Sequence, residues 1–316
     1  MGEKIATRVA YGKALVEFGE QYPNLVVLDA DLSGSTQSAM FAKAFPDRFF
    51  NLGIAEQNMM GVAAGLAASG KQVFASSFAM FATGRCYEQI RTSIVFPKLN
   101  VKVVGSHGGL SVGEDGATHQ CCEDIALMRT LPGMTVVCPA DAFEMRLAVK
   151  ALLDRPGPAY LRLARLATEV YTETLPGYHF ELGKGTFLRP GKDVTIIATG
   201  MMVGMAWDAA KILAEQGIDA RVIDIHTIKP LDEEMVISAA RETGCVVTSE
   251  EHSIVGGLGD AVCSLLSENC PVPVVRHGVK DLFGRSGKAQ DVLDYFGLNS
   301  QGIVEHVKKA IALKKG

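Results

Sequence analysis

The sequence lacks several features that would assign it to common classes of protein. No stretch of its 316 residues approaches the roughly 20 uninterrupted apolar residues that a membrane-spanning helix needs. Its seven cysteines are scattered and show no C-x-x-C spacing, so neither a disulfide framework nor a zinc site is expected. No G-x-G-x-x-G follows the first expected strand, which argues against a dinucleotide-binding dehydrogenase. The cysteine pattern favours a protein of the reducing cytoplasm.

Clusters of basic residues are also scarce. The net charge is -4, and the clearest lysine-rich stretch is the C-terminal VKKAIALKKG, which predicts a terminal helix with a solvated lysine face. Without basic clusters interleaved with aromatics, neither a nucleic-acid nor a membrane partner is expected. The opening MGEKIATRVAYGKAL predicts an amphipathic helix and not a secretory signal, because the acidic Glu3 interrupts its start.

What the sequence does contain is enough apolar residues, 48% of the chain, for more than one hydrophobic core. At this length two domains are expected. Short apolar strands such as NLVVLDADL, LNVKVVGSH and IDARVIDIHTIKP alternate with helical stretches such as GRCYEQIRTSIVF, which is typical of parallel sheets covered on both faces. We therefore expect an α/β protein with two doubly wound domains. The larger parallel-sheet domain spans residues 1–175, a linker spans 176–192, and a smaller α/β domain spans 193–316.

Glu56 stands at the head of the apolar segment NLGIAEQNMMGVAAGLAASG. One explanation is capping, because acidic residues are favoured in the first turn of a helix. The helix behind it is apolar on nearly all faces and carries Gly61 and Gly65, which predicts burial and the close approach of another backbone. A carboxylate that leads into a dry environment needs a specific partner. Capping and a functional role therefore both stay open.

Polar side chains follow several of the expected strands. They are Ser35, His107, Arg165 and, in the loop GEDGATHQ, Glu114, Asp115 and His119. Ligands of open parallel sheets bind beyond the carboxyl ends of the strands. Hydroxyl, imidazole, carboxylate and guanidinium groups at one such edge suit a polyhydroxylated anionic ligand such as a sugar phosphate.

A glycine cluster, Gly256, Gly257 and Gly259, opens an expected helix in the second domain. Such a turn can bind an anion at the helix N-terminus. The dinucleotide fingerprint is incomplete here, however, so a structural tight turn is the preferred interpretation.

The segments GIAEQNM, SFAMF and GEDGATHQ, in this order, resemble the thiamine-diphosphate enzymes of the transketolase family. The likeness covers essentially the whole chain and is to the pyrimidine-binding and C-terminal domains. It implies that Glu56 is catalytic, since the family's glutamate hydrogen-bonds a ring nitrogen of the cofactor's aminopyrimidine and promotes loss of the thiazolium proton. Phe78 and Phe81 match the aromatic residues that pack on the pyrimidine. Gly84 stands where transketolases have a further tyrosine, so either Tyr87 compensates or the stacking is thinner.

The resemblance also implies a set of substrate-binding residues. Four positions match those that hold the substrate phosphate, and two match those that contact hydroxyls near the reacting carbons: Arg8, Ser35, His107 and Arg165 for the phosphate, and Asp115 and His119 for the hydroxyls. His119 is additionally expected to be catalytic. Retention of all four phosphate positions favours a sugar-phosphate substrate, although donor and acceptor are left open.

The family's metal-binding G-D-G motif is missing from this sequence. In the family this motif, with a later asparagine, binds the diphosphate of thiamine diphosphate through a divalent cation. We therefore expect the C-terminal subunit of a split transketolase that shares the cofactor with an N-terminal partner chain. The partner would hold most of the Mg²⁺ or Ca²⁺, no metal ligand is expected in this chain, and the assembly is expected to be an α2β2 heterotetramer. Alone, the chain should be inert.

Three other functions stay open. A 1-deoxyxylulose-5-phosphate synthase-like enzyme also has GIAEQ, but such enzymes normally carry the missing domain in one chain. The β subunit of a 2-oxo-acid dehydrogenase is split in the same way, but would not need the phosphate-binding positions. A non-catalytic assembly module would be expected to have lost Glu56 or the aromatic pair, and both are present.

Overall fold

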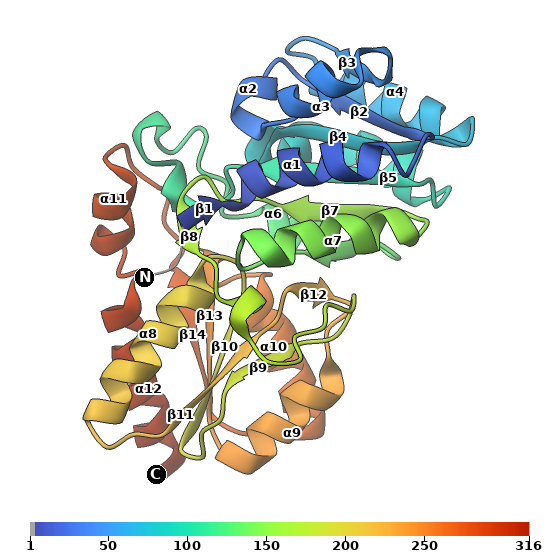
Figure 1. The fold of residues 1–316 in the computed structure, drawn as a ribbon. Helices are drawn as coiled ribbons and strands as arrows, with labels where there is room; N and C mark the ends of the chain where they lie inside the picture. The colour runs from blue at the N-terminus through green and yellow to red at the C-terminus, as the bar shows by residue number, and fades with distance from the viewer. Residues whose placement is uncertain (1–3, 316) are drawn as a thin grey trace.

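The computed structural model describes residues 4–315, which form two α/β units placed end to end (Figure 1). The first unit is coloured blue to green and the second yellow to red. The expected fold class, two α/β domains of which the first holds the larger, mainly parallel sheet, is confirmed.

The sheet of the first unit has seven strands in the order β12-β6-β7-β5-β4-β2-β3. The strands are β2 (Leu25–Asp29), β3 (Phe49–Asn51), β4 (Gln72–Phe78), β5 (Val101–Ser106), β6 (Thr135–Val137), β7 (Ala159–Arg162) and β12 (Thr227–Lys229). All neighbours run parallel except β12, which pairs antiparallel with β6. Every residue of β2 and β5 is buried, as expected for central strands with helices on both faces.

Two layers of helices cover this sheet. On one face α1 (Thr7–Gly19) lies beside α7 (Ala142–Asp154), and on the other lie α4 (Glu56–Ala68), α6 (Asp124–Arg129) and two π-helical turns, η2 (Met80–Arg85) and η3 (Ile90–Val95). The alternation of strand side chains divides the core between them. Val27 packs with α1 and α7, whereas Val26 and Leu28 pack with α4.

The remaining elements of this unit are short. They are β1 (Lys4–Ala6) and β8 (Ala167–Glu169), which pair with each other, then α2 (Ser33–Thr36), α3 (Ala39–Ala44), η1 (Pro46–Arg48), α5 (Tyr87–Gln89), η4 (Leu110–Asp115) and η5 (Thr172–Thr174). Several of these lie in the loops that follow the strands and therefore shape the edge where ligands of such sheets bind.

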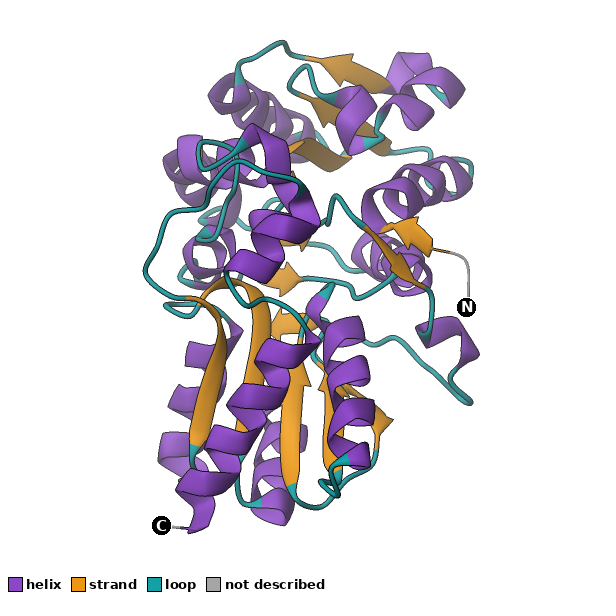
Figure 2. Cartoon of the chain, turned by 90° about the vertical axis from the view of Figure 1, so that its left-hand side faces the viewer, coloured by secondary structure: helices purple, strands orange, loops and turns teal. Residues whose placement is uncertain are grey.

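The second unit has a five-stranded sheet in the order β14-β13-β10-β11-β9. Its strands are β9 (Thr186–Arg189), β10 (Val194–Ala198), β11 (Ala220–Asp224), β13 (Val246–Ser253) and β14 (Val274–Val279), and only β9 is antiparallel. Figure 2 shows these strands standing between two helical layers. The helices are α8 (Met202–Glu215), α9 (Glu233–Thr243), α10 (Leu258–Asn269), α11 (Ala289–Tyr295) and α12 (Ser300–Lys315).

One hydrophobic cluster runs through both units. Ile223 of β11 and Val246 of β13 belong to the same buried cluster as Val136 and Tyr160 of the first unit. The strand β12 lies in the second half of the chain but completes the first sheet. Loops of the second unit are thereby held against the strand ends of the first.

Several local expectations were wrong. The chain opens with β1 at Lys4–Ala6, and the helix begins only at Thr7, while residues 1–3 lie outside the described part. The stretch 218–230 forms two strands in two different sheets, β11 in the second and β12 in the first, separated by Ile225 and His226. The expected helix over 84–96 is present, but most of its turns are π-helical and not α-helical. Within the expected linker, β9 is part of the second sheet.

The expectation for α4 also needs correction. Only one face of the helix is buried, and Gly61 and Gly65 are exposed with no atom within 4 Å of the position that a Cβ would take. No second backbone of this chain approaches them. None of the helices in residues 4–315 combines the length and the apolar character that crossing a bilayer requires.

Candidate active site

Glu56 is the first residue of α4, and hydrogen bonds to Asn51 hold the turn that precedes this helix. The side-chain oxygen of Asn51 accepts hydrogen bonds from the backbone N–H groups of Asp31 and Gly53, both at 3.0 Å, and Gly53 adopts a φ of +72°. Only 2% of Glu56 is exposed. Its Oε2 accepts a hydrogen bond from Nη1 of Arg85 at 2.7 Å, so the carboxylate has the specific partner that its burial demands.

Two phenylalanines lie beside this ion pair. Phe78 ends β4 and Phe81 lies in η2, and their rings are nearly parallel at 12° with centroids 6.3 Å apart. The guanidinium of Arg85 lies over the Phe81 ring at 4.7 Å, and His119 meets the same ring edge-on at 5.2 Å. π-helical turns such as η2 occur often at functional sites. The structure therefore brings Glu56, Phe78, Phe81 and His119 into one neighbourhood.

A hollow opens next to Phe81. It is lined by Met80, Phe81, Gly84, Arg85, Ala117, Thr118 and Phe283. Phe283 is 85% exposed and comes from the second unit, and no sequence pattern predicted its presence here. Nothing in its local sequence marks it, since its place depends on how the two units pack. Gly84 leaves the wall of this hollow without a side chain.

Tyr87 is placed differently from the aromatic pair. Its hydroxyl shares a hydrogen bond with the Thr130 hydroxyl at 2.9 Å, and its ring packs against the core. Among the residues described, it makes no ring contact with Phe78 or Phe81. The structure therefore does not bring Tyr87 to the hollow.

Two arginines and a histidine gather at the neighbouring strand ends. Nη1 of Arg8 donates to the backbone carbonyl of Ser35 at 2.8 Å, and Nε of Arg8 is buried without a partner. Burial lowers the pKa of Arg8, and the nearby charge of Arg165 lowers it further. This concentration of positive charge is the kind of environment that binds an anion.

His107 links this cationic group to the aromatic pair. Its ring stacks on Phe78 with centroids 4.1 Å apart, and its Nδ1 shares a hydrogen bond with the Ser106 hydroxyl at 2.8 Å. Burial, with Arg8 and Arg165, lowers the pKa of His107 to about 3, so the imidazole is neutral at pH 7. Its φ of +58° is unusual for a residue that is not glycine, and such strain clusters at functional sites.

The GEDGATHQ loop supplies the remaining predicted residues. Nη1 of Arg165 donates to the Val112 carbonyl and to Oε2 of Glu114, the latter at 2.8 Å. The pKa of Glu114 is lowered by a backbone N–H and then by Arg165. Asp115 is exposed at the end of η4, and the structure shows no hydrogen bond or ion pair between it and the other predicted site residues that it describes.

The second unit holds this loop in place. Nε2 of Gln120 donates to the carbonyl of Arg285 at 3.0 Å and to that of Leu110 at 3.2 Å. Gly113 lies against the backbone of Ala289, and a Cβ at Gly113 would come 3.0 Å from its nitrogen. The loop that carries Asp115 and His119 is thus fixed from both units.

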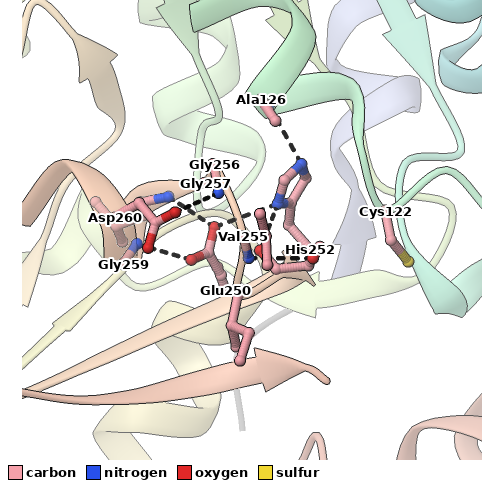
Figure 3. Close-up of polar contacts among 12 residues, drawn as sticks. Cys122, Ala126, Glu250, His252, Val255, Gly256, Gly257, Gly259 and Asp260 are labelled. Carbon is pink, nitrogen blue, oxygen red and sulfur yellow. Dashed lines mark hydrogen bonds and ion pairs between the residues drawn. The ribbon is translucent and has the colours of Figure 1, made fainter. Parts of the chain in front are cut away.

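The glycine cluster in the second unit has a structural role. The Glu250 carboxylate accepts hydrogen bonds from the backbone N–H groups of Leu258 at 2.7 Å and Gly259 at 2.8 Å (Figure 3). A Cβ at Gly257 would lie 2.0 Å from Glu250 Oε2. The N-terminus of α10 is therefore occupied by a carboxylate of the chain itself, in agreement with the tight-turn interpretation.

Comparison with known proteins identifies the family. The model of the transketolase pyrimidine-binding domain matches residues 3–170, and that of the transketolase C-terminal domain matches residues 183–303. The chain belongs to the transketolase family. A transketolase C-terminal section of Methanocaldococcus jannaschii is 52% identical over 95% of this chain and 94% of its own length.

Two further relatives of this transketolase-family chain have named substrates. The 6-deoxy-6-sulfo-D-fructose transketolase subunit SqwH of Clostridium sp. (strain MSTE9) is 45% identical over 94% of this chain and 92% of its own length. An apulose-4-phosphate transketolase subunit of Phocaeicola vulgatus is 43% identical over 96% of this chain and 98% of its own.

A solved structure described as a split gene transketolase, inactive beta4 tetramer, superimposes with a TM-score of 0.91. It is 55% identical and covers 98% of this chain and 99% of its own. In both sequence and fold, the chain corresponds to the C-terminal subunit of a split transketolase.

Proposed function

We propose that this chain is the C-terminal subunit of a thiamine-diphosphate-dependent transketolase that transfers a two-carbon ketol unit between sugar phosphates. One observation carries the proposal: Glu56, the Phe78–Phe81 pair and the Arg8–His107–Arg165 group converge at one sheet edge. A buried carboxylate and two parallel rings suit a planar nitrogen heterocycle, while the cationic group suits an anionic end of a sugar.

The residues present fit the pyrimidine half of thiamine diphosphate. Phe78 and Phe81 offer an aromatic surface, and Glu56 offers a buried carboxylate beside it. When bound, the cofactor supplies a thiazolium carbon that can carry the transferred ketol unit. The part of Glu56 is to hold and exchange a proton with a ring nitrogen in a site that largely excludes water.

The cationic group would bind the anionic end of the substrate. Arg8 and Arg165 provide charge and forked hydrogen-bond donors. With the Ser106 hydroxyl donating to Nδ1, neutral His107 would carry its hydrogen on Nε2 and donate it to the same anion. His119 and Asp115, on the loop fixed by the second unit, would contact the hydroxyls near the reacting carbons. His119 also lies against the aromatic pair, which supports this role.

The proposed enzyme needs a second chain. An N-terminal transketolase subunit would bind the diphosphate through Mg²⁺ or Ca²⁺, and two copies of each chain would form the cytoplasmic assembly. The solved relative described as an inactive beta4 tetramer supports the expectation that C-terminal subunits alone associate without activity. The relatives that act on a sulfosugar and on apulose 4-phosphate indicate that the sugar varies while an anionic group is retained.

The test is an activity assay with and without the partner. This chain is assayed alone and mixed with the N-terminal-type chain of the same genome, in both cases with thiamine diphosphate and Mg²⁺. Ribose 5-phosphate is the acceptor. The donor is xylulose 5-phosphate, 6-deoxy-6-sulfofructose or apulose 4-phosphate. Parallel reactions offer pyruvate with glyceraldehyde 3-phosphate, and 2-oxo acids with a redox dye. We expect ketol transfer in the mixture only.

The outcomes separate the alternatives. Condensation of pyruvate would indicate a 1-deoxyxylulose-5-phosphate synthase-like enzyme, and dye reduction would indicate a 2-oxo-acid dehydrogenase. A stable complex that is inactive with every substrate would favour the assembly-module interpretation. Activity of this chain alone would contradict the requirement for a partner.

A further inference from the structure

Arg85 occupies the space between Glu56 and Phe81. Its guanidinium lies over the Phe81 ring at 4.7 Å and donates from Nη1 to Glu56 Oε2 at 2.7 Å. The same side chain lines both the hollow beside Phe81 and a second hollow formed by Ile54, Ala55, Glu56, Gln57 and Asn58. Arg85 therefore lies on the boundary between the carboxylate and the aromatic surface.

These contacts are of the two kinds that a pyrimidine would make in the proposed function. A guanidinium is planar, stacks on aromatic faces and donates hydrogen bonds to carboxylates. A cofactor ring held by Glu56 and the phenylalanines would stack on the same face and bond to the same carboxylate. The ring and the guanidinium therefore compete for one place.

We propose that Arg85 is an internal plug of the cofactor pocket, whose guanidinium must move out before the pyrimidine can bind. This inference rests on the proposed function. In the chain by itself, the plug keeps the Glu56 charge neutralised and the Phe81 face covered. Cofactor binding then has to displace the guanidinium.

The surroundings of Arg85 permit such a movement. Its side chain is 46% exposed, whereas that of Glu56 is 2% exposed, so the arginine and not the glutamate can turn toward solvent. Water can therefore reach the guanidinium and compete with Glu56 for its hydrogen bonds. The preceding residue, Gly84, has no side chain to block the turn, and η2 ends at Arg85 itself.

The plug predicts an unusual effect of removing an ion pair next to a binding pocket: binding of the cofactor should improve. A ligand that binds only the open state has an apparent Kd equal to its intrinsic Kd divided by the fraction of protein in that state. If Arg85 closed the pocket about four-fifths of the time, removing its guanidinium would lower the Kd about fivefold. Arg85→Met keeps the length of the side chain but removes its charge and hydrogen bond. Arg85→Lys keeps the charge and loses the planar group, and an intermediate effect is expected.

The experiment is isothermal titration calorimetry of thiamine diphosphate with Mg²⁺ into the complex of this chain with its N-terminal-type partner. Arg85→Met and Arg85→Lys are compared with wild type and with Arg91→Met, which removes an exposed arginine from the neighbouring η3. Thermal melts establish that each complex is folded. Tighter binding by Arg85→Met, with Arg91→Met unchanged, supports the plug.

Equal or weaker binding by both folded Arg85 variants would overturn it, because Arg85 would then be neutral or a ligand of the cofactor. Should Arg85→Met fail to assemble, Arg85→Lys decides by the same criterion. A wild-type complex that binds no thiamine diphosphate would contradict the proposed function, whereas binding that is merely unchanged in the variants contradicts the plug alone.

Discussion

The active-site edge of the first unit and the junction between the units both contain several charged residues, but the two regions differ in how these charges are paired. At the junction, Glu250 is held by backbone N–H groups of α10, and Asp124 pairs with Arg162 at 2.7 Å and accepts from the Tyr160 hydroxyl at 2.6 Å. At the edge, Arg8 has no ion pair among the described residues, and Arg165 has only Glu114, whose side chain is 60% exposed.

The difference shows where a ligand belongs. The glycine cluster near α10 has the local sequence of an anion site, yet the chain fills that place with its own carboxylate. The strand-end arginines have no buried carboxylate to neutralise them. Charge that is paired internally, as in Asp124–Arg162, belongs to the fold, whereas uncompensated charge that is retained in a folded protein is more often functional.

The largest expected effect is at the edge. Glu56→Gln removes the carboxylate that exchanges a proton and should lower ketol-transfer kcat of the reconstituted complex about 100- to 10,000-fold. The melting temperature of the complex should change little. Steady-state kinetics and a thermal melt measure the two quantities, and a variant that retains wild-type kcat would remove Glu56 from the reaction.

Asp124→Asn tests the junction, where the expected loss is one of stability. It leaves Arg162 charged and buried, which should lower the free energy of unfolding by about 3 to 5 kcal/mol. Asp154→Asn, in the exposed Lys150–Asp154 pair, is the control and should cost about 0 to 1 kcal/mol. Urea denaturation gives both values. If the two substitutions cost the same, the internal pairing at the junction is not what stabilises it.

The free energy of unfolding should depend on pH through the ionisation of Glu250. Burial raises the pKa of Glu250 from 4.5 to about 7, so between these values the unfolded chain loses a proton that the folded chain keeps. Relative to Glu250→Gln, the wild type should therefore lose up to about 1.4 kcal/mol of stability per pH unit as the pH rises through this window. Below 4.5 the difference should be constant. Urea denaturation from pH 4 to 8 measures it, and a difference that is flat with pH would show that Glu250 is ionised in both states.

The smallest effects concern two glycines. Gly61→Ala adds a methyl group where nothing lies within 4 Å, so the helix should gain about 0.5 to 1 kcal/mol. Gly257→Ala would force a Cβ toward the Glu250 carboxylate and should cost about 1 to 3 kcal/mol. Melting of the isolated chain compares them. Stabilisation by both substitutions would mean that the turn at Gly257 is not tightly packed.

Much of this comparison could be anticipated from local sequence. The small-residue helix after Glu56 and the polar residues after the strands depend on short-range patterns, and GIAEQNM, SFAMF and GEDGATHQ led to the family. Local pattern could not show that 218–230 divides between two sheets, because no glycine or proline separates the two strands. It could not show which way Gly61 faces either, since a helix made of small residues has no distinct polar face.

The contacts that Arg85 and Phe283 make at the site could not be predicted from the sequence for a related reason. Arg85 meets Glu56 across 29 positions of sequence, and Phe283 reaches the hollow only because the second unit packs on the first. Neither residue belongs to a recognisable motif. Their roles depend on tertiary placement, which single-chain periodicity does not encode.

The measurement that tests the central claim most directly compares ribose 5-phosphate with ribose as acceptors for the reconstituted complex. If the uncompensated arginines hold the anion, wild type should prefer the phosphorylated acceptor in kcat/KM, and Arg8→Gln combined with Arg165→Gln should reduce that preference about 100-fold or more, since each charged hydrogen bond contributes about 1.5 to 3 kcal/mol. Turnover of ribose itself should be nearly unchanged. A preference that survives in the double variant would contradict the assignment of this edge as the anion site.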